Sequence, residues 1–143
     1  MAMLDLMADH ATLRILLVED EALVAMLIED ALGLHGHVVV GTADTSAEAL
    51  RIADAEQPDL ALCDIRLAEG DNGVLVAQHL AERGIPSLFL SGNCPVKSDH
   101  PLIIGCMPKP FHSGQLGVAV AAARAIAEGR RPDAVPPGLS LYA

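Results

Sequence analysis

Aromatic side chains and positive charges are both scarce in this chain. Its 143 residues include no Trp, one Tyr and two Phe, and the formal net charge at pH 7 is −10. Proteins bind single-stranded nucleic acids by stacking bases on aromatic rings, and they bind phosphate backbones with clustered Lys and Arg. The sequence has little of either, so we expect no nucleic-acid partner. The acidity instead suits a basic protein surface or a metal ion.

The chain also lacks a long apolar run. Its longest uncharged stretch, residues 111–123, is short for a bilayer span and is rich in Gly and Ala. Asp5 and Asp9 interrupt the apolar residues at the start of the sequence, so no signal peptide is predicted. We therefore expect a cytoplasmic protein that does not insert into a membrane.

Cysteine is sparse too. The three cysteines, Cys63, Cys94 and Cys106, show no C-x-x-C spacing and leave one thiol unmatched in any pairing. A small disulfide scaffold or a zinc site has more cysteines, at closer spacing. The sequence predicts three reduced thiols.

What the chain has in quantity is aliphatic residues, in a regular order. Half of the sequence is hydrophobic, which is enough for the core of one domain. Short apolar runs alternate with segments of helical periodicity, a pattern that predicts right-handed crossovers and a parallel sheet covered on both faces. The predicted strands are 14–18, 37–41, 59–63, 86–90 and 102–107, and the predicted helices begin near residues 22, 46, 74 and 113.

This pattern divides the chain into three parts. Residues 1–12 are expected to be an N-terminal extension, residues 13–128 the folded domain, and residues 129–143 a disordered, proline-rich tail. Pro95 and Pro101 interrupt the stretch between the last two strands, so the helix expected there is short or absent. The tail is too short to fold into a DNA-binding unit.

Polar residues follow four of the predicted strands. Glu19 and Asp20 follow the first strand, Asp64 the third, Ser91 the fourth, and Lys109 comes shortly after the fifth. All four ends lie on one edge of a parallel sheet, where ligands bind in open α/β folds. Carboxylates brought together repel each other unless a cation intervenes, and such hard oxygen ligands suit Mg²⁺. A carboxylate beside a metal, a Lys and a hydroxyl can accept a phosphoryl group.

Each residue also has a simpler interpretation. Glu19 and Asp20 could cap the following helix, Ser91 could be a turn residue, and Lys109 could be a solvated residue between prolines. Asp64 could cap the next loop. Any one of these is the more common situation, but all of them together on one edge would be a coincidence.

Four stretches, in this order, resemble the receiver domain of two-component response regulators. They are residues 15–21, 60–67, 88–92 and 109–111, and the resemblance covers residues 13–128. It implies a flavodoxin-like five-stranded sheet in the order 2-1-3-4-5. It also implies that Asp64 is the phosphoacceptor and that Lys109 pairs with the acyl phosphate.

The resemblance assigns the remaining site residues as well. Asp20, Asp64 and the backbone carbonyl of Arg66 would bind Mg²⁺, with Glu19 contributing indirectly. Ser91 would take the role of the conserved hydroxyl, and the Lys109-Pro110 peptide bond would be cis. The expected partners are a sensor histidine kinase or phosphotransfer protein, and a downstream protein or a second copy bound through the face of strands four and five.

The chain departs from the family at the switch. Cys106 stands three residues before Lys109, where many receivers have Tyr or Phe. We therefore expect the segment from residue 94 to residue 101 to order on phosphorylation, with no aromatic rotation. The closest resemblance is to stand-alone receivers with a shortened fourth helix.

Four functions are compatible with these residues. The leading one is a stand-alone, non-enzymatic response regulator; the second is a phosphate sink for a kinase, with no output partner. A small-molecule aspartyl-phosphate hydrolase is less compatible, because such enzymes often have an Asp two residues after the nucleophile, where this chain has Arg66. A degenerate receiver is disfavoured by the intact Asp20, Asp64, Ser91 and Lys109.

Overall fold

A single six-stranded sheet organises the molecule. The computed structural model describes residues 12–98 and 100–142, so the predicted extension at 1–12 lies almost entirely outside the described residues. The strand order is β2-β1-β3-β4-β5-β6. The first five strands are parallel in the predicted order 2-1-3-4-5, which confirms the flavodoxin-like fold, and β6 is antiparallel to β5. The strands are β1 Arg14–Val18, β2 Val38–Ala43, β3 Leu60–Asp64, β4 Ser87–Ser91, β5 Ile103–Pro108 and β6 Ser140–Leu141.

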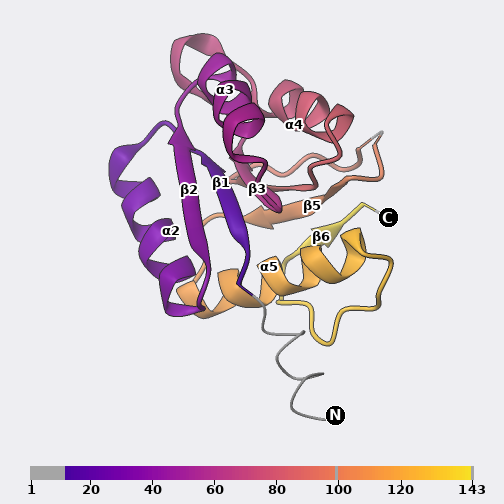
Figure 1. Ribbon diagram of the computed structural model, residues 1–143. Helices are drawn as coiled ribbons and strands as arrows, with labels where there is room; N and C mark the ends of the chain where they lie inside the picture. The colour runs from indigo at the N-terminus through magenta and orange to yellow at the C-terminus, as the bar shows by residue number, and fades with distance from the viewer. Residues whose placement is uncertain (1–11, 99, 143) are drawn as a thin grey trace.

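Four α-helices cover the two faces of this sheet (Figure 1). They are α2 Ala22–Leu34, α3 Ser46–Glu56, α4 Gly73–Glu82 and α5 Ser113–Ala127. Helices α2 and α5 pack on one face and α3 and α4 on the other, so the sheet separates two apolar clusters. The β3 residues Leu60 to Cys63 are almost fully buried between these clusters. This burial explains their uninterrupted apolar sequence and leaves Asp64 as the first residue that can face solvent. None of the helices among the described residues is long and apolar enough to cross a membrane.

Helices α3 and α4 begin with side chains that cap their first backbone N–H groups. The Thr45 hydroxyl accepts a hydrogen bond from the backbone N–H of Glu48 at the start of α3. The Glu48 side chain does not complete a capping box with Thr45, because it pairs with Arg51 one turn further along the helix. At the start of α4, Asn72 accepts a hydrogen bond from the N–H of Val74.

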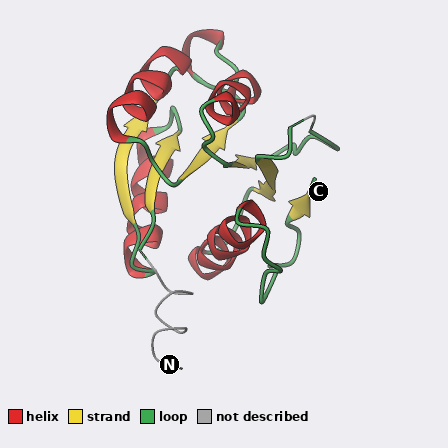
Figure 2. Cartoon of the chain, turned by 45° about the vertical axis from the view of Figure 1, so that its right-hand side comes forward, coloured by secondary structure: helices red, strands yellow, loops and turns green. Residues whose placement is uncertain are grey.

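The connection from β4 to β5 is the largest departure from regular α/β alternation. No helix lies between these strands among residues 92–98 and 100–102, as expected from the two prolines. Figure 2 shows this connection as a loop. The side chain of Val96 within it is 97% exposed.

The C-terminal tail is not disordered, and this prediction was wrong for the tail residues that the structure describes. Residues Ser140 and Leu141 pair with Cys106 and Gly105 of β5, and the N–H of Tyr142 donates to the carbonyl of Ile104. The Tyr142 ring packs edge-on against Phe89, and its hydroxyl donates to the carbonyl of Pro95. Pairing with a distant strand compensates for the weak local propensity of a Pro- and Gly-containing segment.

The prediction of three reduced thiols was also wrong. Cys94 and Cys106 form a disulfide with their Cα atoms 5.8 Å apart, and only Cys63 is free. The two cysteines are 12 positions apart in sequence. They meet because the loop after β4 returns directly into β5, and sequence spacing alone cannot reveal this proximity.

Candidate phosphoacceptor and metal site

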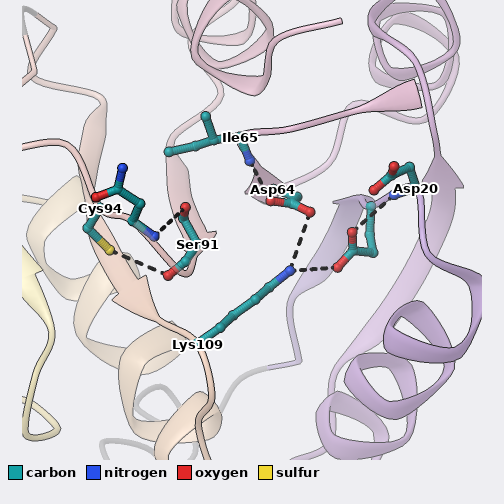
Figure 3. A network of polar contacts seen from close by, with 8 residues as sticks. Asp20, Asp64, Ile65, Ser91, Cys94 and Lys109 are labelled. Atoms are coloured by element: carbon teal, nitrogen blue, oxygen red, sulfur yellow. Dashed lines mark hydrogen bonds and ion pairs between the residues drawn. The ribbon is translucent and has the colours of Figure 1, made fainter. Parts of the chain in front are cut away.

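The predicted acidic and basic residues meet at one edge of the sheet (Figure 3). Glu19 and Asp20 follow β1, Asp64 ends β3, and Lys109 follows β5. β1 and β3 are adjacent, and β5 lies two strands beyond β3. The Lys109 side chain, which follows β5, therefore extends across the end of the sheet toward the acids.

The Lys109 ammonium group bridges two of the carboxylates. Its Nζ lies 2.9 Å from Oε1 of Glu19 and 3.3 Å from Oδ2 of Asp64. The Glu19 side chain is 1% exposed, and that of Asp64 is 13% exposed. Asp20 is exposed, and its backbone N–H donates to Oε2 of Glu19. The acids of the site thus range from the buried Glu19 to the solvent-exposed Asp20.

Burial and these close contacts shift the pKa values of Glu19 and Lys109. Burial, together with the neighbouring Asp64, raises the pKa of Glu19 to about 7, although Lys109 counteracts the shift. Burial acts to lower the pKa of Lys109, but its hydrogen bond and ion pair with Glu19, and the charge of Asp64, raise that pKa above its ordinary value. Lys109 therefore stays positively charged. Its single positive charge cannot neutralise all of the neighbouring carboxylates when they are ionised.

The geometry fits a divalent cation. Glu19, Asp20 and Asp64 each offer a carboxylate oxygen, and these oxygens lie within 4.8 Å of one another. A small hard cation that keeps several water ligands matches this donor set. The carbonyl of Arg66 as a further ligand stays a prediction: Arg66 lies in the loop after β3, where it forms an isolated bridge with Asn72.

The backbone around Asp64 fixes the orientation of its carboxylate. Oδ1 of Asp64 accepts a 2.7 Å hydrogen bond from the N–H of Ile65, so one oxygen is held while the other faces Lys109. The first turn of α4 contacts the backbone next to Asp64, since the N–H of Gly73 donates to the carbonyl of Ile65. A Cβ atom on Gly73 would overlap the carbonyl oxygen of Asp64.

Ser91 lies at the border of the site. It is 7% exposed, and its hydroxyl oxygen accepts a hydrogen bond from the N–H of Asn93. Its carbonyl accepts from the backbone N–H of Lys109, which ties the ends of β4 and β5 together. No contact between the Ser91 hydroxyl and the carboxylates is found among the described residues. The Lys109-Pro110 bond is cis, as predicted.

Two residues that shape the site were missed by the sequence analysis. Gly73 precedes the residue near which the third helix was predicted to begin, and its lack of a side chain allows α4 to approach Asp64. Asp71 accepts hydrogen bonds from the N–H and the hydroxyl of Ser46, which fastens the loop after β3 to the start of α3. A glycine at the beginning of a helix was the available signal for the first; the second had none.

The fold and the site together define a doubly wound α/β domain with an acid cluster and a lysine at the carboxyl edge of its parallel strands. Residues 15–121 match the model of the response regulator receiver domain. This chain therefore belongs to the response regulator receiver family.

The similar proteins include several regulators named PhyR. The phyllosphere-induced regulator PhyR of Methylorubrum extorquens is 34% identical over 129 residues, which cover 83% of this chain and 46% of that protein. The structure described as the anti-anti-sigma factor PhyR from Bartonella quintana is 28% identical with a TM-score of 0.72, covering 90% of this chain and 53% of that one. The chain thus spans about half the length of these relatives.

A shorter protein is also similar. The solution structure of SdrG from Sphingomonas melonis Fr1 is 38% identical with a TM-score of 0.61, and the match covers 78% of this chain and 93% of that chain.

Proposed function

We propose that this protein accepts a phosphoryl group on Asp64 from a phosphohistidine of a sensor histidine kinase or a phosphotransfer protein. In this proposal, Asp64 Oδ attacks phosphorus, the P–N bond to the imidazole breaks, and an acyl phosphate forms. The observation that carries the proposal is the Lys109 ammonium group held between Glu19 and Asp64 at the open edge of the sheet.

Each residue of the site has a distinct part in this step. The hydrogen bond from Ile65 to Oδ1 orients the carboxylate, and the 3.3 Å contact with Lys109 positions a cation where the phosphoryl oxygens would lie. Glu19 and Asp20, with Asp64, would hold Mg²⁺. That ion, when bound, would supply charge neutralisation for the phosphoryl oxygens.

We further propose that the phosphorylated form signals by binding a protein and does not turn over a small-molecule substrate. A phosphoryl group adds close to two negative charges and three strong acceptors. Ser91 ends β4, the strand next to β3, and its hydroxyl is the group that we expect to respond. The description of the Bartonella relative as an anti-anti-sigma factor supports a protein partner. Arg66 two residues after Asp64 disfavours the hydrolase alternative.

The phosphorylation step can be tested with a small phosphodonor. Acetyl phosphate and Mg²⁺ should add one phosphoryl group, detected as a mass increase that hydroxylamine removes. Asp64→Asn should abolish the adduct, because it removes the nucleophile. Asp59→Asn is a matched control. Asp59 immediately precedes β3, at the end opposite Asp64, and its carboxylate accepts from the N–H of Arg14. Labelling of Asp64→Asn at the wild-type rate would refute the assignment.

The output can be separated from a phosphate sink by a pull-down. Protein treated with beryllofluoride, a mimic of the acyl phosphate, should retain a partner that untreated protein does not. Lys109→Ala should accept the phosphoryl group but lose this difference, because the lysine links the phosphorylated carboxylate to β5. A protein that labels on Asp64 but retains no partner in either form would instead be a sink.

A further inference from the structure

The loop between β4 and β5 is fastened to the rest of the molecule at few points. The N–H of Asn93 donates to the Ser91 hydroxyl, and the carbonyl of Pro95 accepts from the hydroxyl of Tyr142. The covalent tether is the disulfide between Cys94 and Cys106. Segments with few backbone hydrogen bonds open easily, so this disulfide is the strongest restraint on the loop.

The two cysteines differ in how firmly they are held. Cys106 is fully buried in β5, opposite Phe89 of β4 and paired on its other side with Ser140 of β6. Cys94 lies in the loop and is half-buried. The disulfide therefore ties a segment without regular secondary structure to a buried strand of the sheet.

The loop also starts at the phosphoacceptor site. Cys94 follows Ser91 by three positions, and its sulfur lies 3.9 Å from the Ser91 carbonyl oxygen. The same carbonyl accepts from the backbone N–H of Lys109. Any movement of Ser91 toward a group on Asp64 must therefore carry Asn93 and Cys94 with it, and the disulfide opposes that movement.

We propose that the Cys94–Cys106 disulfide is a redox modification site that limits the response of the Ser91 loop to phosphorylation. The inference rests on the proposed function, because it concerns the movement that an acyl phosphate on Asp64 would cause. Oxidised protein would keep the loop against β5 in both states. Reduced protein would let the loop follow Ser91.

The chemistry requires a dithiol, of the kind found in dithiothreitol or in a thioredoxin-type protein. A thiolate of the dithiol attacks the more accessible sulfur, on Cys94; the sulfur–sulfur bond breaks, and Cys106 leaves as a thiolate that takes up a proton. The second thiol of the reagent then attacks the mixed disulfide and releases Cys94. Two electrons and two protons pass to the protein, and the reagent becomes a disulfide.

The site can first be established by counting thiols. Protein denatured without reductant should bind one equivalent of iodoacetamide, on Cys63, which is fully buried in the folded chain. Protein reduced with dithiothreitol should bind three equivalents. Three equivalents from air-oxidised protein purified without reductant would overturn the proposal, because the disulfide would then not form.

Its effect is measured by hydrogen exchange with and without beryllofluoride. The change in protection across residues 91–102 should be at least about twofold larger in reduced than in oxidised protein. Cys94→Ser should respond like the reduced protein under both conditions, because Ser cannot form the disulfide. Cys63→Ala is the control and should keep the difference between the two forms.

Parallel labelling with acetyl phosphate distinguishes the two failures. If Asp64 is labelled in both redox forms and residues 91–102 respond equally, the redox site is refuted while the phosphoacceptor assignment stands. If Asp64 is labelled in neither form, the proposed function is refuted, and the redox inference falls with it.

Discussion

Gly73 controls the position of Asp64, the proposed phosphoacceptor, although it carries no functional group. The first turn of α4 contacts the backbone at the end of β3, and a side chain at Gly73 would overlap the carbonyl of Asp64. The hydrogen bond from Gly73 to the carbonyl of Ile65 depends on the same approach. A residue with no side chain therefore determines where the carboxylate of Asp64 lies.

Gly73→Ala should lower the free energy of unfolding by about 1–3 kcal/mol, since α4 must move away from the strand. It should also slow labelling of Asp64 by acetyl phosphate. Gly114→Ala is the control: a Cβ there meets nothing within 4 Å, and the change in a helix should be neutral or stabilising by up to about 1 kcal/mol. Urea denaturation of the three proteins decides the matter; equal stability of Gly73→Ala and wild type would contradict the close approach.

His37 makes stability depend on pH. The backbone N–H of Leu13 donates to Nδ1 of His37, which requires the neutral ring. Burial lowers the pKa of His37 below its ordinary value of 6.5, and electrostatic interactions with His35 and Arg124 lower it further. The unfolded chain thus binds a proton at a higher pH than the folded chain does.

The free energy of unfolding should therefore decrease as the pH falls below about 6.5, until the lowered pKa is passed. His37→Asn keeps an acceptor for Leu13 but does not titrate, so its stability should change less over this range. Thermal melts between pH 7.5 and 5.5 provide the comparison. Identical pH profiles for the two proteins would show that His37 is not responsible.

Among the elements, β6 depends on a residue that is remote from it in sequence, Gly105. Gly105 of β5 lies so close to the tail that a Cβ atom would overlap the carbonyl oxygen of Ser140. The pairing itself is short, and both β6 residues are exposed. The absence of a side chain at Gly105 therefore permits the sixth strand.

Gly105→Ala should displace the tail, lower stability by about 1–3 kcal/mol, and make residues 130–142 sensitive to protease. In a chain truncated after residue 135 the same substitution should have much less effect, because the three nearest atoms to the added Cβ all belong to the tail. This double-mutant cycle isolates the contact. An equal loss of stability in both backgrounds would place the cause within β5.

The success of the sequence analysis differs between elements for a physical reason. Asp64 and Lys109 were predictable because parallel strands all end at one edge, so local patterns determine the convergence. The pairing of Cys94 with Cys106 and of Ser140 with β5 depends on how a loop and a tail return to the sheet. No local pattern encodes those contacts, so both segments were assigned the wrong state.

The molecule as a whole is strongly acidic, and three of its carboxylates, those of Glu19, Asp20 and Asp64, lie close together at the carboxyl edge of the sheet. Net charge is −10, and Lys109 is the only cation that the described residues bring into contact with Glu19 and Asp64. Repulsion between the carboxylates should therefore lower the stability of the metal-free protein.

Mg²⁺ should raise the melting temperature in proportion to the logarithm of its concentration above the Kd. Asp20→Ala should raise the melting temperature without Mg²⁺, because repulsion is relieved, and should weaken or abolish the response to Mg²⁺. Glu21→Ala removes a neighbouring exposed acid outside the cluster and should retain the response. If NaCl at equal ionic strength stabilises wild type as much as Mg²⁺ does, the effect is screening and no assembled site exists.

The sixth strand also affects how separate molecules meet. A sheet with an unpaired edge strand can pair with another chain, and natural proteins cover or interrupt such edges. In the described part of the chain, β6 shields β5, and β2 is left as the long strand at a sheet edge. A molecule with one such edge can at most pair into dimers, whereas one with two can grow into filaments. Removing the tail would expose β5 as a second edge strand, so that molecules could pair through both edges and aggregate without limit.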